Sequence, residues 1–342
     1  MRVAVLGAGT VGGEVVRALI ERPGDLTATD GAPLELVGIA VRDVARARDA
    51  GLPPELLTDA PAHLVAADDT DVIVELMGGD EPAHTLIAAA LAAGKSVVTA
   101  NKHVIAHHGP NLEAAARRTG AALRFEASVG GGIPVLGPLA TELAANRVVV
   151  VRGIVNGTTN YILSAMTDEG REYADVLAAA QAAGYAEADP RGDVEGLDAV
   201  NKLVILARLA FGLWNDPAAV ATIAMDGPGS GRPGITGIGA ADVAAAIATG
   251  RTIKLIAEAR RGLDGTLSAS VLPIALPSDA ALARTSGVLN RIEIDAEPVG
   301  TVAFSGPGAG GPATSSAVLG DLVAISRELG STWAGLPPAV GS

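Results

Sequence analysis

Five acidic residues precede a single lysine in the stretch GYAEADPRGDVEGLDAVNK, which runs from Gly184 to Lys202. Asp198 and Lys202 are four residues apart, so on a helix their side chains lie on one face. A lysine held by a carboxylate at the edge of a cleft can donate a proton to an oxygen that is becoming an alkoxide. A solvated turn followed by a surface salt bridge accounts for the same residues without any catalysis.

The element that carries this pair is predicted to be a helix that begins between Asp193 and Glu195. Its apolar positions recur at helical spacing and are Leu197, Val200, Leu203, Val204 and Ala207. The residues after Lys202 form a nearly unbroken apolar run, LVILARLA. A buried helix whose first turns emerge at a cleft therefore favours the catalytic interpretation.

A glycine pattern near the start of the chain predicts a dinucleotide site. RVAVLGAGTVGGEVVRALIER reads as a short apolar strand, a GxGxxG turn and an amphipathic helix. The first glycine permits the tight turn, the second lets the backbone approach a pyrophosphate, and the third allows close helix packing. The helix N-terminus would face the anion. The predicted cofactor-binding residues of this turn are Gly7, Gly9, Thr10, Val11 and Gly12.

The pattern continues as alternating strands and helices, which is typical of a parallel, doubly wound sheet. The further expected strands are LELVGIAVRD, DVIVELMGG, KSVVTANK and ALRFEASV. Ligands bind at the carboxyl ends of such strands, so Gly78 and Lys102 are expected at the cofactor. Lys102 would face the nicotinamide or the substrate. Alternatively, it is simply a lysine that opens a helix, where the helix dipole is mildly unfavourable to it.

Arg42 and Asp43 lie at the end of the second expected strand, where an NAD site usually carries an acid for the ribose hydroxyls. Because Arg42 comes first, its guanidinium favours the 2′-phosphate of NADP(H). The alternative is a surface Arg42 paired with Asp43, which leaves NAD(H) open.

Composition limits the remaining function classes. The 342 residues suffice for two domains, and 49% hydrophobic with 2% aromatic residues suits an α/β protein. A net charge of −13 argues against nucleic acid or an anionic membrane as partner. The chain has no cysteine, no apolar run near the roughly 18 residues of a membrane span, and no room for a leader before its first strand. We expect a cytoplasmic protein with a small-molecule substrate.

Seven motifs in this order resemble those of homoserine dehydrogenase, and the match covers nearly the whole chain. They are GxGxVG, ELMGG, TANK, EASVGGGIP, NGTTNYIL, GYAEADPRGDVEGLDAVNKLVILA and GPGAGGPATSSAVLGDL. The long central motif is highly specific, whereas the glycine motif is shared by many enzymes. The resemblance implies NAD(P)-linked interconversion of aspartate 4-semialdehyde and homoserine, a step toward threonine and methionine.

The resemblance also implies roles for individual residues. Lys202 corresponds to the proton donor, and Lys102 to a lysine between cofactor and substrate that assists proton transfer or orientation. Which of the two lysines gives up the proton stays open. The implied substrate-binding residues are Gly184, Glu187, Asp193 and Asp198, and the carboxylates of Glu187 and Asp198 hold the substrate's ammonium group. Gly306 and Gly308 would lie near the nicotinamide, or else form only the turn before a helix.

In the family, EASVGGGIP binds a structural monovalent cation, Na⁺ or K⁺. The corresponding residues are Glu126 and the carbonyls of Val129, Gly131 and Ile133. The same glycines also suit a hinge between domains.

The expected organisation is a Rossmann domain over residues 1–128, an α+β catalytic and dimerisation domain over 129–305, and a segment over 306–342 whose helix packs back on the first domain. VVVVRGIVNGTTNYIL is expected as a strand that runs into a polar NGTTN turn. Further strands are expected at RTIKLIAEARR, LSASVLPIAL and RIEIDAEPVGTVAF, and the family resemblance implies a homodimer through their sheet.

Two other functions compete with the homoserine dehydrogenase interpretation. Aspartate-semialdehyde dehydrogenase acts on the same metabolite but needs a cysteine nucleophile, which this chain lacks. A nucleotide-sensing relative without catalysis would be expected to have lost Lys202, Asp198 or Glu187, and all three are present.

Overall fold

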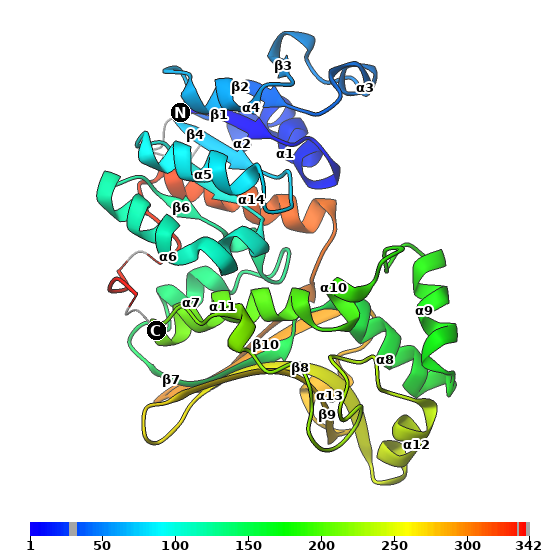
Figure 1. Ribbon diagram of the computed structural model, residues 1–342. Helices are drawn as coiled ribbons and strands as arrows, with labels where there is room; N and C mark the ends of the chain where they lie inside the picture. The colour runs from blue at the N-terminus through cyan, green and yellow to red at the C-terminus, as the bar shows by residue number, and fades with distance from the viewer. Residues whose placement is uncertain (27–32, 334, 340–342) are drawn as a thin grey trace. The chain divides into compact units, whose positions relative to one another are not determined.

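The structure is a computed structural model that describes residues 1–26, 33–333 and 335–339. The chain forms two compact units (Figure 1). The first comprises Met1–Glu142 and the described residues after Gly308, and the second comprises Leu143–Gly308. The first boundary thus lies later in the chain than the one expected after residue 128.

The described elements of the first unit are β1 (Arg2–Leu6), α1 (Thr10–Glu21), α2 (Pro23–Leu26), β2 (Glu35–Ala40), α3 (Val44–Asp49), β3 (Leu57–Thr58), α4 (Pro61–Ala66), β4 (Val72–Glu75), α5 (Ala83–Ala92), β5 (Ser96–Thr99), α6 (Lys102–Thr119), β6 (Leu123–Arg124), α7 (Leu136–Ala140) and α14 (Gly311–Ser326), with single 3-10 turns at Pro54–Leu56 and Glu126–Ser128.

The six strands form a wholly parallel sheet in the order β3-β2-β1-β4-β5-β6, which confirms the doubly wound fold. The chain moves one way from β1 to β2 and the other way from β4 to β5. Because such crossovers share one hand, α1 and α5 must cover opposite faces of the sheet. The order reverses between β1 and β4.

Helices α1 and α14 pack together over one face of this sheet. Val15 and Leu19 of α1 join Val318 and Leu322 of α14 in one apolar cluster with residues of β1, β4 and β5. The strands are apolar on both faces because both faces are covered. The helix that ends the described chain therefore completes the core that the first strands begin.

The described elements of the second unit are β7 (Arg147–Ile154), α8 (Gly157–Glu169), α9 (Tyr173–Ala182), α10 (Arg191–Val194), α11 (Leu197–Phe211), α12 (Ala240–Ala248), β8 (Arg251–Arg261), β9 (Leu267–Pro277), α13 (Ala281–Arg284), β10 (Leu289–Glu297) and β11 (Gly300–Pro307), with a 3-10 turn at Pro217–Ala219.

The second unit has an antiparallel sheet in the order β11-β10-β7-β8-β9. Helices α8 and α11 pack on it, and α11 is buried along most of its length. This combination of sheet and helices confirms the predicted α+β character. RIEIDAEPVGTVAF, expected as one strand segment, forms the hairpin of β10 and β11.

Two local expectations were wrong. The helix expected from Asp193 or Glu195 is broken into α10 and α11, because Gly196 adopts a left-handed conformation with φ of 88°. The polar sequence NGTTN is not a turn but the start of α8, where the Asn156 side chain accepts a hydrogen bond from the backbone N–H of Thr159. In both cases one residue with a special backbone role sets the helix boundary.

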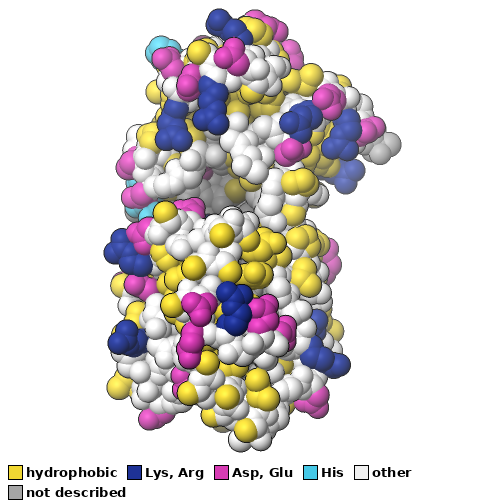
Figure 2. All heavy atoms as spheres, turned by 90° about the vertical axis from the view of Figure 1, so that its right-hand side faces the viewer, with side chains coloured by type: hydrophobic (Ala, Val, Ile, Leu, Met, Phe, Trp, Pro, Cys, Tyr) yellow, Lys and Arg dark blue, Asp and Glu magenta, His cyan; other side chains and the backbone are white. Residues whose placement is uncertain are grey.

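No helix in the described ranges is long and apolar enough to cross a membrane. On the face shown in Figure 2, basic and acidic side chains lie beside one another rather than in one continuous basic area.

Two lysines of this unit, Lys202 on α11 and Lys254 on β8, are buried, and Lys254 is almost fully buried. Its ammonium donates to Asn160 Oδ1 at 2.8 Å, to Ser164 Oγ at 3.0 Å and to the carbonyl of Thr285 at 2.8 Å. Burial lowers the pKa of Lys254 to about 8 from 10.5. Its three neutral acceptors and its β8 position set it apart from the Asp198–Lys202 pair.

The buried Lys254 should make stability depend on alkaline pH. Between about pH 8 and 10.5 the unfolded chain retains a proton on this lysine that the folded chain has released, so stability rises with pH in that window. We therefore expect the free energy of unfolding of the wild-type chain, relative to that of Lys254→Met, to increase by about 2 kcal/mol from pH 8 to pH 10.5. Urea unfolding at several pH values measures this, and a difference that stays constant or moves the other way would contradict it.

Candidate active site

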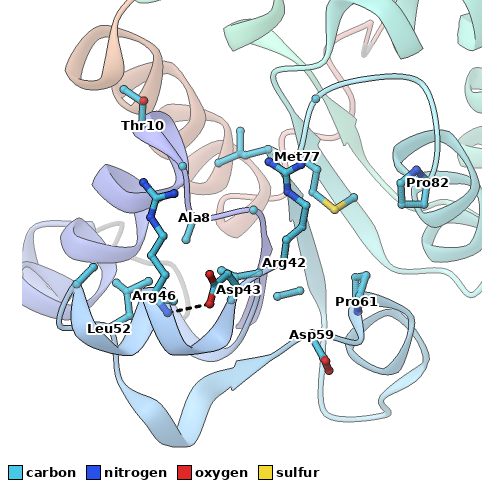
Figure 3. Close-up of a pocket in the computed structure, with 18 of the residues that line it drawn as sticks. Ala8, Thr10, Arg42, Asp43, Arg46, Leu52, Asp59, Pro61, Met77 and Pro82 are labelled. Carbon is cyan, nitrogen blue, oxygen red and sulfur yellow. Dashed lines mark hydrogen bonds between the residues drawn. The ribbon is translucent and has the colours of Figure 1, made fainter.

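A cavity of about 910 Å³ lies at the carboxyl end of the first unit's sheet, where the strand order reverses. Its walls come from the segments that follow β1, β2 and β4, namely Gly7–Thr10, Ala40–Asp43 and Leu76–Gly78. Doubly wound sheets bind nucleotides at this position. Figure 3 shows Arg42 and Arg46 extending along the cavity on either side of Ala8.

The glycine turn has the geometry that a pyrophosphate site requires. Gly7 adopts φ of 98°, and its N–H donates to the carbonyl of Ala40 at 2.8 Å. A Cβ on Gly12 would overlap the carbonyl oxygen of Gly7, whereas Gly9 has no atom within 4 Å of such a Cβ. Gly9 and Thr10 are exposed toward the cavity at the N-terminus of α1. Val11 instead packs against the core.

Asp43, beside the cavity, is the N-cap of α3. Its carboxylate accepts a hydrogen bond from the backbone N–H of Arg46 at 2.9 Å and so caps α3 (Figure 3). Arg42 is exposed and lines the cavity. The first charged residue after β2 is therefore a cation, and the acid that follows it caps α3.

A buried carboxylate ties the ends of β4 and β5 together. Glu75 is fully buried, and its Oε1 accepts from the N–H groups of Met77 at 2.8 Å and Gly78 at 3.2 Å. Its Oε2 accepts from the Thr99 hydroxyl at 2.6 Å. Thr99 in turn accepts from the N–H of Asn101 at 2.9 Å. The loop at the cavity and the residues that lead into α6 are thereby fixed to each other.

Lys102 begins α6 directly after this network. Asn101 caps the helix by accepting from the N–H of Val104 at 3.2 Å, and its amide N–H donates to the carbonyl of Gly79 at 2.8 Å. Lys102 itself is partly buried. The N–H of Gly78 thus belongs to this hydrogen-bonded group, and Lys102 directly follows its member Asn101. No sequence pattern indicated Glu75, Thr99 or Asn101 as members of the group.

The Asp198–Lys202 pair lies in a polar cluster of the second unit. Lys202 is only 9% exposed, and its ammonium donates to Asp198 Oδ2 and to the carbonyl of Val155, both at 2.7 Å. The Asn156 amide donates to Asp198 Oδ2 at 2.8 Å and to Asp193 Oδ1 at 2.7 Å. The cluster therefore joins the start of α8 to α10 and α11.

Asn156 is a site residue that sequence analysis missed. Its Oδ1 caps α8, while its amide N–H groups bridge two carboxylates from another part of the chain. The only sequence signal was an asparagine after a strand, which indicates a helix cap and nothing more. The bridging role arises from tertiary contacts.

Glu187 and Gly184 lie outside this hydrogen-bonded cluster. Glu187 is exposed, and its backbone carbonyl accepts from the Gln181 side chain at 3.0 Å. Gly184 ends α9 with φ of 76°. The neighbouring Asp189 pairs with Arg191 at 2.6 Å, which lowers the pKa of Asp189 to about 2. Part of the acidic stretch is thus a solvated turn, as the alternative interpretation proposed, while Asp193 and Asp198 belong to the cluster.

Glu126 lies in the buried loop that was predicted to hold a cation. Its Oε1 accepts from the N–H groups of Val135 and Leu136 at 2.7 and 2.8 Å, and its Oε2 accepts from that of Gly137 at 2.7 Å. Burial raises the pKa of Glu126, and the nearby Asp321 carboxylate raises it further, while the backbone N–H groups act in the opposite direction. One lone pair of Oε2 is left after these bonds.

Asp321 of α14 fixes the same loop. Its carboxylate accepts from Arg124 at 2.8 Å and from the backbone N–H of Glu126 at 2.8 Å. Val129, Gly131 and Ile133, which follow Glu126 in the same loop, are buried, and Gly131 adopts φ of 59°. The carboxylates of Glu126 and Asp321 therefore both bond to the backbone of this loop.

Four histidines gather around Asp80 in the first unit. Asp80 Oδ1 lies 2.8 Å from His108 Nε2, and His84 stacks on His108 while His103 stacks on His107. Within the described ranges, no three His, Asp or Glu side chains are arranged as metal ligands.

Gly306 and Gly308 belong to the end of the second unit. Gly306 pairs with Asn290 across β10 and β11, and a Cβ on Gly308 would overlap the Asn290 amide. The chain then continues to Gly311, whose Cβ position lies 3.0 Å from the carbonyl oxygen of Thr10 in the glycine turn.

Comparison with protein-family models gives two matches that together span most of the chain. Residues 7–126 match a model described as homoserine dehydrogenase, NAD binding domain, and residues 134–323 match one described as homoserine dehydrogenase.

Curated relatives carry the same description. The homoserine dehydrogenase of Corynebacterium glutamicum is 44% identical over 349 residues, which cover 98% of this chain and 76% of that protein. That of Mycobacterium leprae is 49% identical over 335 residues, which cover 96% of this chain and 73% of that protein.

Solved structures agree. A homoserine dehydrogenase from Thiobacillus denitrificans superposes with a TM-score of 0.91 at 37% identity, covering 100% of this chain and 79% of that one. A hyperthermophilic archaeal homoserine dehydrogenase in complex with NADPH gives a TM-score of 0.77 at 27% identity, covering 96% of this chain and 98% of that one.

Proposed function

The chain belongs to the homoserine dehydrogenase family, and we propose which of its residues carry the family's reaction. That reaction is the reversible reduction of L-aspartate 4-semialdehyde to L-homoserine with NAD(P)H, on the route to threonine and methionine. The observation that supports the proposal best is the buried ammonium of Lys202, which is held between Asp198 and the carbonyl of Val155.

Lys202 is the proposed proton donor. Two of its three N–H donors are engaged by Asp198 and Val155, so the third is available for the substrate's carbonyl oxygen. The reduced nicotinamide, when bound, supplies the hydride. As the carbonyl oxygen gains negative charge, Lys202 transfers a proton to it, and the carboxylate of Asp198 holds the ammonium in place. Lys102 serves as the alternative donor or orients the same carbonyl.

The substrate's ammonium group is assigned to the acidic residues of the same unit. Asp193 and Asp198 converge on Asn156, so two carboxylates face one region of the site. Glu187 is exposed and free to contact a ligand in the turn that Gly184 begins. A cationic amino group and a reducible carbonyl together require this combination of acids and a lysine.

We assign the cofactor to the first unit's cavity as NADP(H), with NAD(H) as the weaker alternative. The pyrophosphate would contact Gly7, Gly9, Thr10 and the N-terminus of α1. Gly78 lines the wall after β4, and Gly306 and Gly308 are assigned to the nicotinamide side. Arg42 would pair with the 2′-phosphate, because Asp43 is engaged as the cap of α3.

The assignment of Arg42 predicts a change in cofactor preference. Arg42→Ala should raise KM for NADPH by about 10-fold or more and leave KM for NADH nearly unchanged, since a charge-assisted bond to phosphate is lost. Arg48→Ala is the matched control, because Arg48 lies on α3 but does not line the cavity. An equal change in KM for NADPH and for NADH would show that Arg42 does not bind the 2′-phosphate.

A monovalent cation is proposed at the Glu126 loop, held by the carbonyls of Val129, Gly131 and Ile133 together with Glu126. The support is physical: burial and then the neighbouring Asp321 carboxylate raise the pKa of Glu126, and a bound cation would offset both effects on the charged carboxylate. Thermal unfolding in KCl or NaCl should therefore begin at a higher temperature than in tetramethylammonium chloride of equal ionic strength. Equal midpoints would argue against the site.

We further propose a cytoplasmic homodimer formed through the sheet of the second unit. The lack of cysteine suits a reducing compartment, and β11 lies at an edge of that sheet with most of its residues exposed or half-exposed. Light scattering should give twice the chain mass of 34.0 kDa.

The direct test is the change in nicotinamide absorbance when purified protein meets aspartate 4-semialdehyde, with NADPH and NADH in parallel. Oxidation of either cofactor, and the reverse reaction with homoserine, supports the assignment. Measurable NADPH binding without turnover would instead favour a nucleotide-sensing role.

A further inference from the structure

Asn156 holds two carboxylates of the second unit with one neutral side chain. Its amide nitrogen donates to Asp193 Oδ1 at 2.7 Å and to Asp198 Oδ2 at 2.8 Å, and the residue is only 5% exposed. Asp193 and Asp198 come from separate helices, α10 and α11. Two like charges within reach of one nitrogen repel each other, so a side chain that gathers them calls for an explanation.

The hydrogen bonds of Asn156 leave one orientation of its amide. Oδ1 accepts from the backbone N–H of Thr159 at 2.8 Å and from the Thr159 hydroxyl at 3.0 Å. A flipped amide would set its NH₂ group against that N–H, and its oxygen against ionised carboxylates that offer no donor. The side chain that caps α8 with its oxygen therefore directs both of its N–H donors at the carboxylates.

The break at Gly196 brings the two carboxylates to this amide. On one continuous helix, residues five positions apart point about 140° away from each other around the axis. Gly196 instead adopts the left-handed conformation with φ of 88°, between α10 and α11. A side chain there would be strained, and its Cβ would lie 3.1 Å from Val271. Asp193 and Asp198 therefore converge because a glycine separates their helices.

The same cluster holds the proposed proton donor. Asp198 Oδ2 accepts from the Lys202 ammonium at 2.7 Å as well as from Asn156, and the carbonyl of Val155 accepts from that ammonium at 2.7 Å. Both bonds to Lys202 remain when the Asn156 amide is removed. Its removal should therefore disturb the spacing of the carboxylates more than the position of the lysine.

We propose that Asn156 is a positioning residue that makes the substrate site specific for a ligand with an ammonium group. It acts through Asp193 and Asp198. Its neutral amide keeps the two carboxylates together without cancelling their charge, whereas a lysine or arginine in its place would satisfy that charge internally. An ammonium group has three N–H donors and bonds strongly to ionised carboxylates. This inference rests on the proposed assignment of the substrate's ammonium group to these acids.

The competing explanation is that Asn156 only stabilises the fold as the cap of α8. Serine and threonine also cap helices, but neither has the two amide donors that bridge the carboxylates. Asn156→Ser and Asn156→Thr therefore retain the cap and remove the bridge. If capping is the whole role, neither variant should distinguish ligands with an amino group from ligands without one.

Asn160 provides a matched control one turn later on α8. It is buried, its amide donates to the carbonyl of Leu289 at 3.0 Å, and its oxygen accepts from Lys254 at 2.8 Å. Asn160→Ser removes the same atoms from the same helix but leaves the contacts of Asn156 with the carboxylates in place. It should lower stability without changing the preference among ligands.

The experiment measures inhibition of the NADPH-dependent reduction of aspartate 4-semialdehyde by L-homoserine and by 4-hydroxybutanoate, which lacks only the amino group of homoserine. For Asn156→Ser we expect the inhibition constant of homoserine to rise about 10-fold, and that of 4-hydroxybutanoate to change by less than about twofold. KM for aspartate 4-semialdehyde should rise with the homoserine constant, with a lesser change in kcat. For Asn160→Ser we expect both inhibition constants to match wild type.

An equal rise of both inhibition constants in Asn156→Ser would overturn the inference, and so would a homoserine constant within about twofold of wild type. Failure of both Asn156→Ser and Asn156→Thr to fold, where Asn160→Ser folds, would also overturn it, because the amide would then serve the fold. A wild-type chain that does not reduce aspartate 4-semialdehyde would instead contradict the proposed function, so the two failures are distinguishable.

Discussion

Lys202→Ala should lower kcat for the reduction of aspartate 4-semialdehyde by about 10²–10⁴-fold, the usual range for loss of a positioned general acid. The variant removes the buried ammonium that Asp198 holds at 2.7 Å, and alanine has no proton to donate in its place. NADPH binding should be unchanged, because Lys202 is not among the residues that line the dinucleotide cavity. Steady-state kinetics and fluorescence titration with NADPH measure the two quantities.

Lys254→Met is the control for this variant. It removes another buried lysine of the same unit, but one whose ammonium bonds to Asn160, Ser164 and the carbonyl of Thr285. We expect a less stable protein with wild-type kcat per folded molecule. If Lys202→Ala keeps its kcat within about 10-fold of wild type, the proton donor lies elsewhere. Lys102→Ala in the same assay then identifies it, since removal of the donor also removes its ionisation from the pH profile of kcat.

Gly12→Ala should weaken NADPH binding by at least about 100-fold, since the new methyl group would overlap the carbonyl oxygen of Gly7 and force the turn open. The pyrophosphate would then lose both the backbone N–H groups and the correctly placed helix N-terminus. Backbone atoms cannot yield as a flexible side chain can. Fluorescence titration with NADPH measures the loss.

The neighbouring Gly13 provides a matched control on the same helix. The nearest atom to a Cβ at Gly13 is the carbonyl oxygen of Ala8 at 3.8 Å, an ordinary contact. Gly13→Ala should therefore bind NADPH normally and be more stable by about 0.5–1 kcal/mol, because alanine is the better helix former. NADPH binding by Gly12→Ala within about threefold of Gly13→Ala would show that the turn does not cradle the cofactor.

Patterns of local sequence predicted most of the fold. The GxGxxG turn, the apolar strands and the helices between them follow from periodicity and glycine placement, and the parallel sheet confirms them. The two-residue strand β3 carries too little sequence to show a pattern. The break at Gly196 was missed because a glycine within an apolar helical pattern is compatible with a continuous helix.

The site was less predictable because its contacts join distant parts of the chain. The spacing of Asp198 and Lys202 predicted their pairing, which follows from helix geometry alone. That Asn156 bridges Asp193 and Asp198, or that Glu75 reaches Thr99, depends on which elements become neighbours. The sequence presents the acidic stretch as one group, whereas the structure separates the exposed Asp189–Arg191 pair from the partly buried Asp193 and Asp198.

The return of α14 to the first unit has a consequence for the order of events at the ribosome. The strands of the first sheet are synthesised before the second unit, but the face covered by Val318 and Leu322 stays exposed until α14 emerges. The residues Leu143–Gly308 of the second unit are synthesised before then. The cofactor-binding unit thus begins synthesis before the second unit and completes its core after it, and a nascent chain released before α14 would present an apolar sheet face to chaperones and proteases.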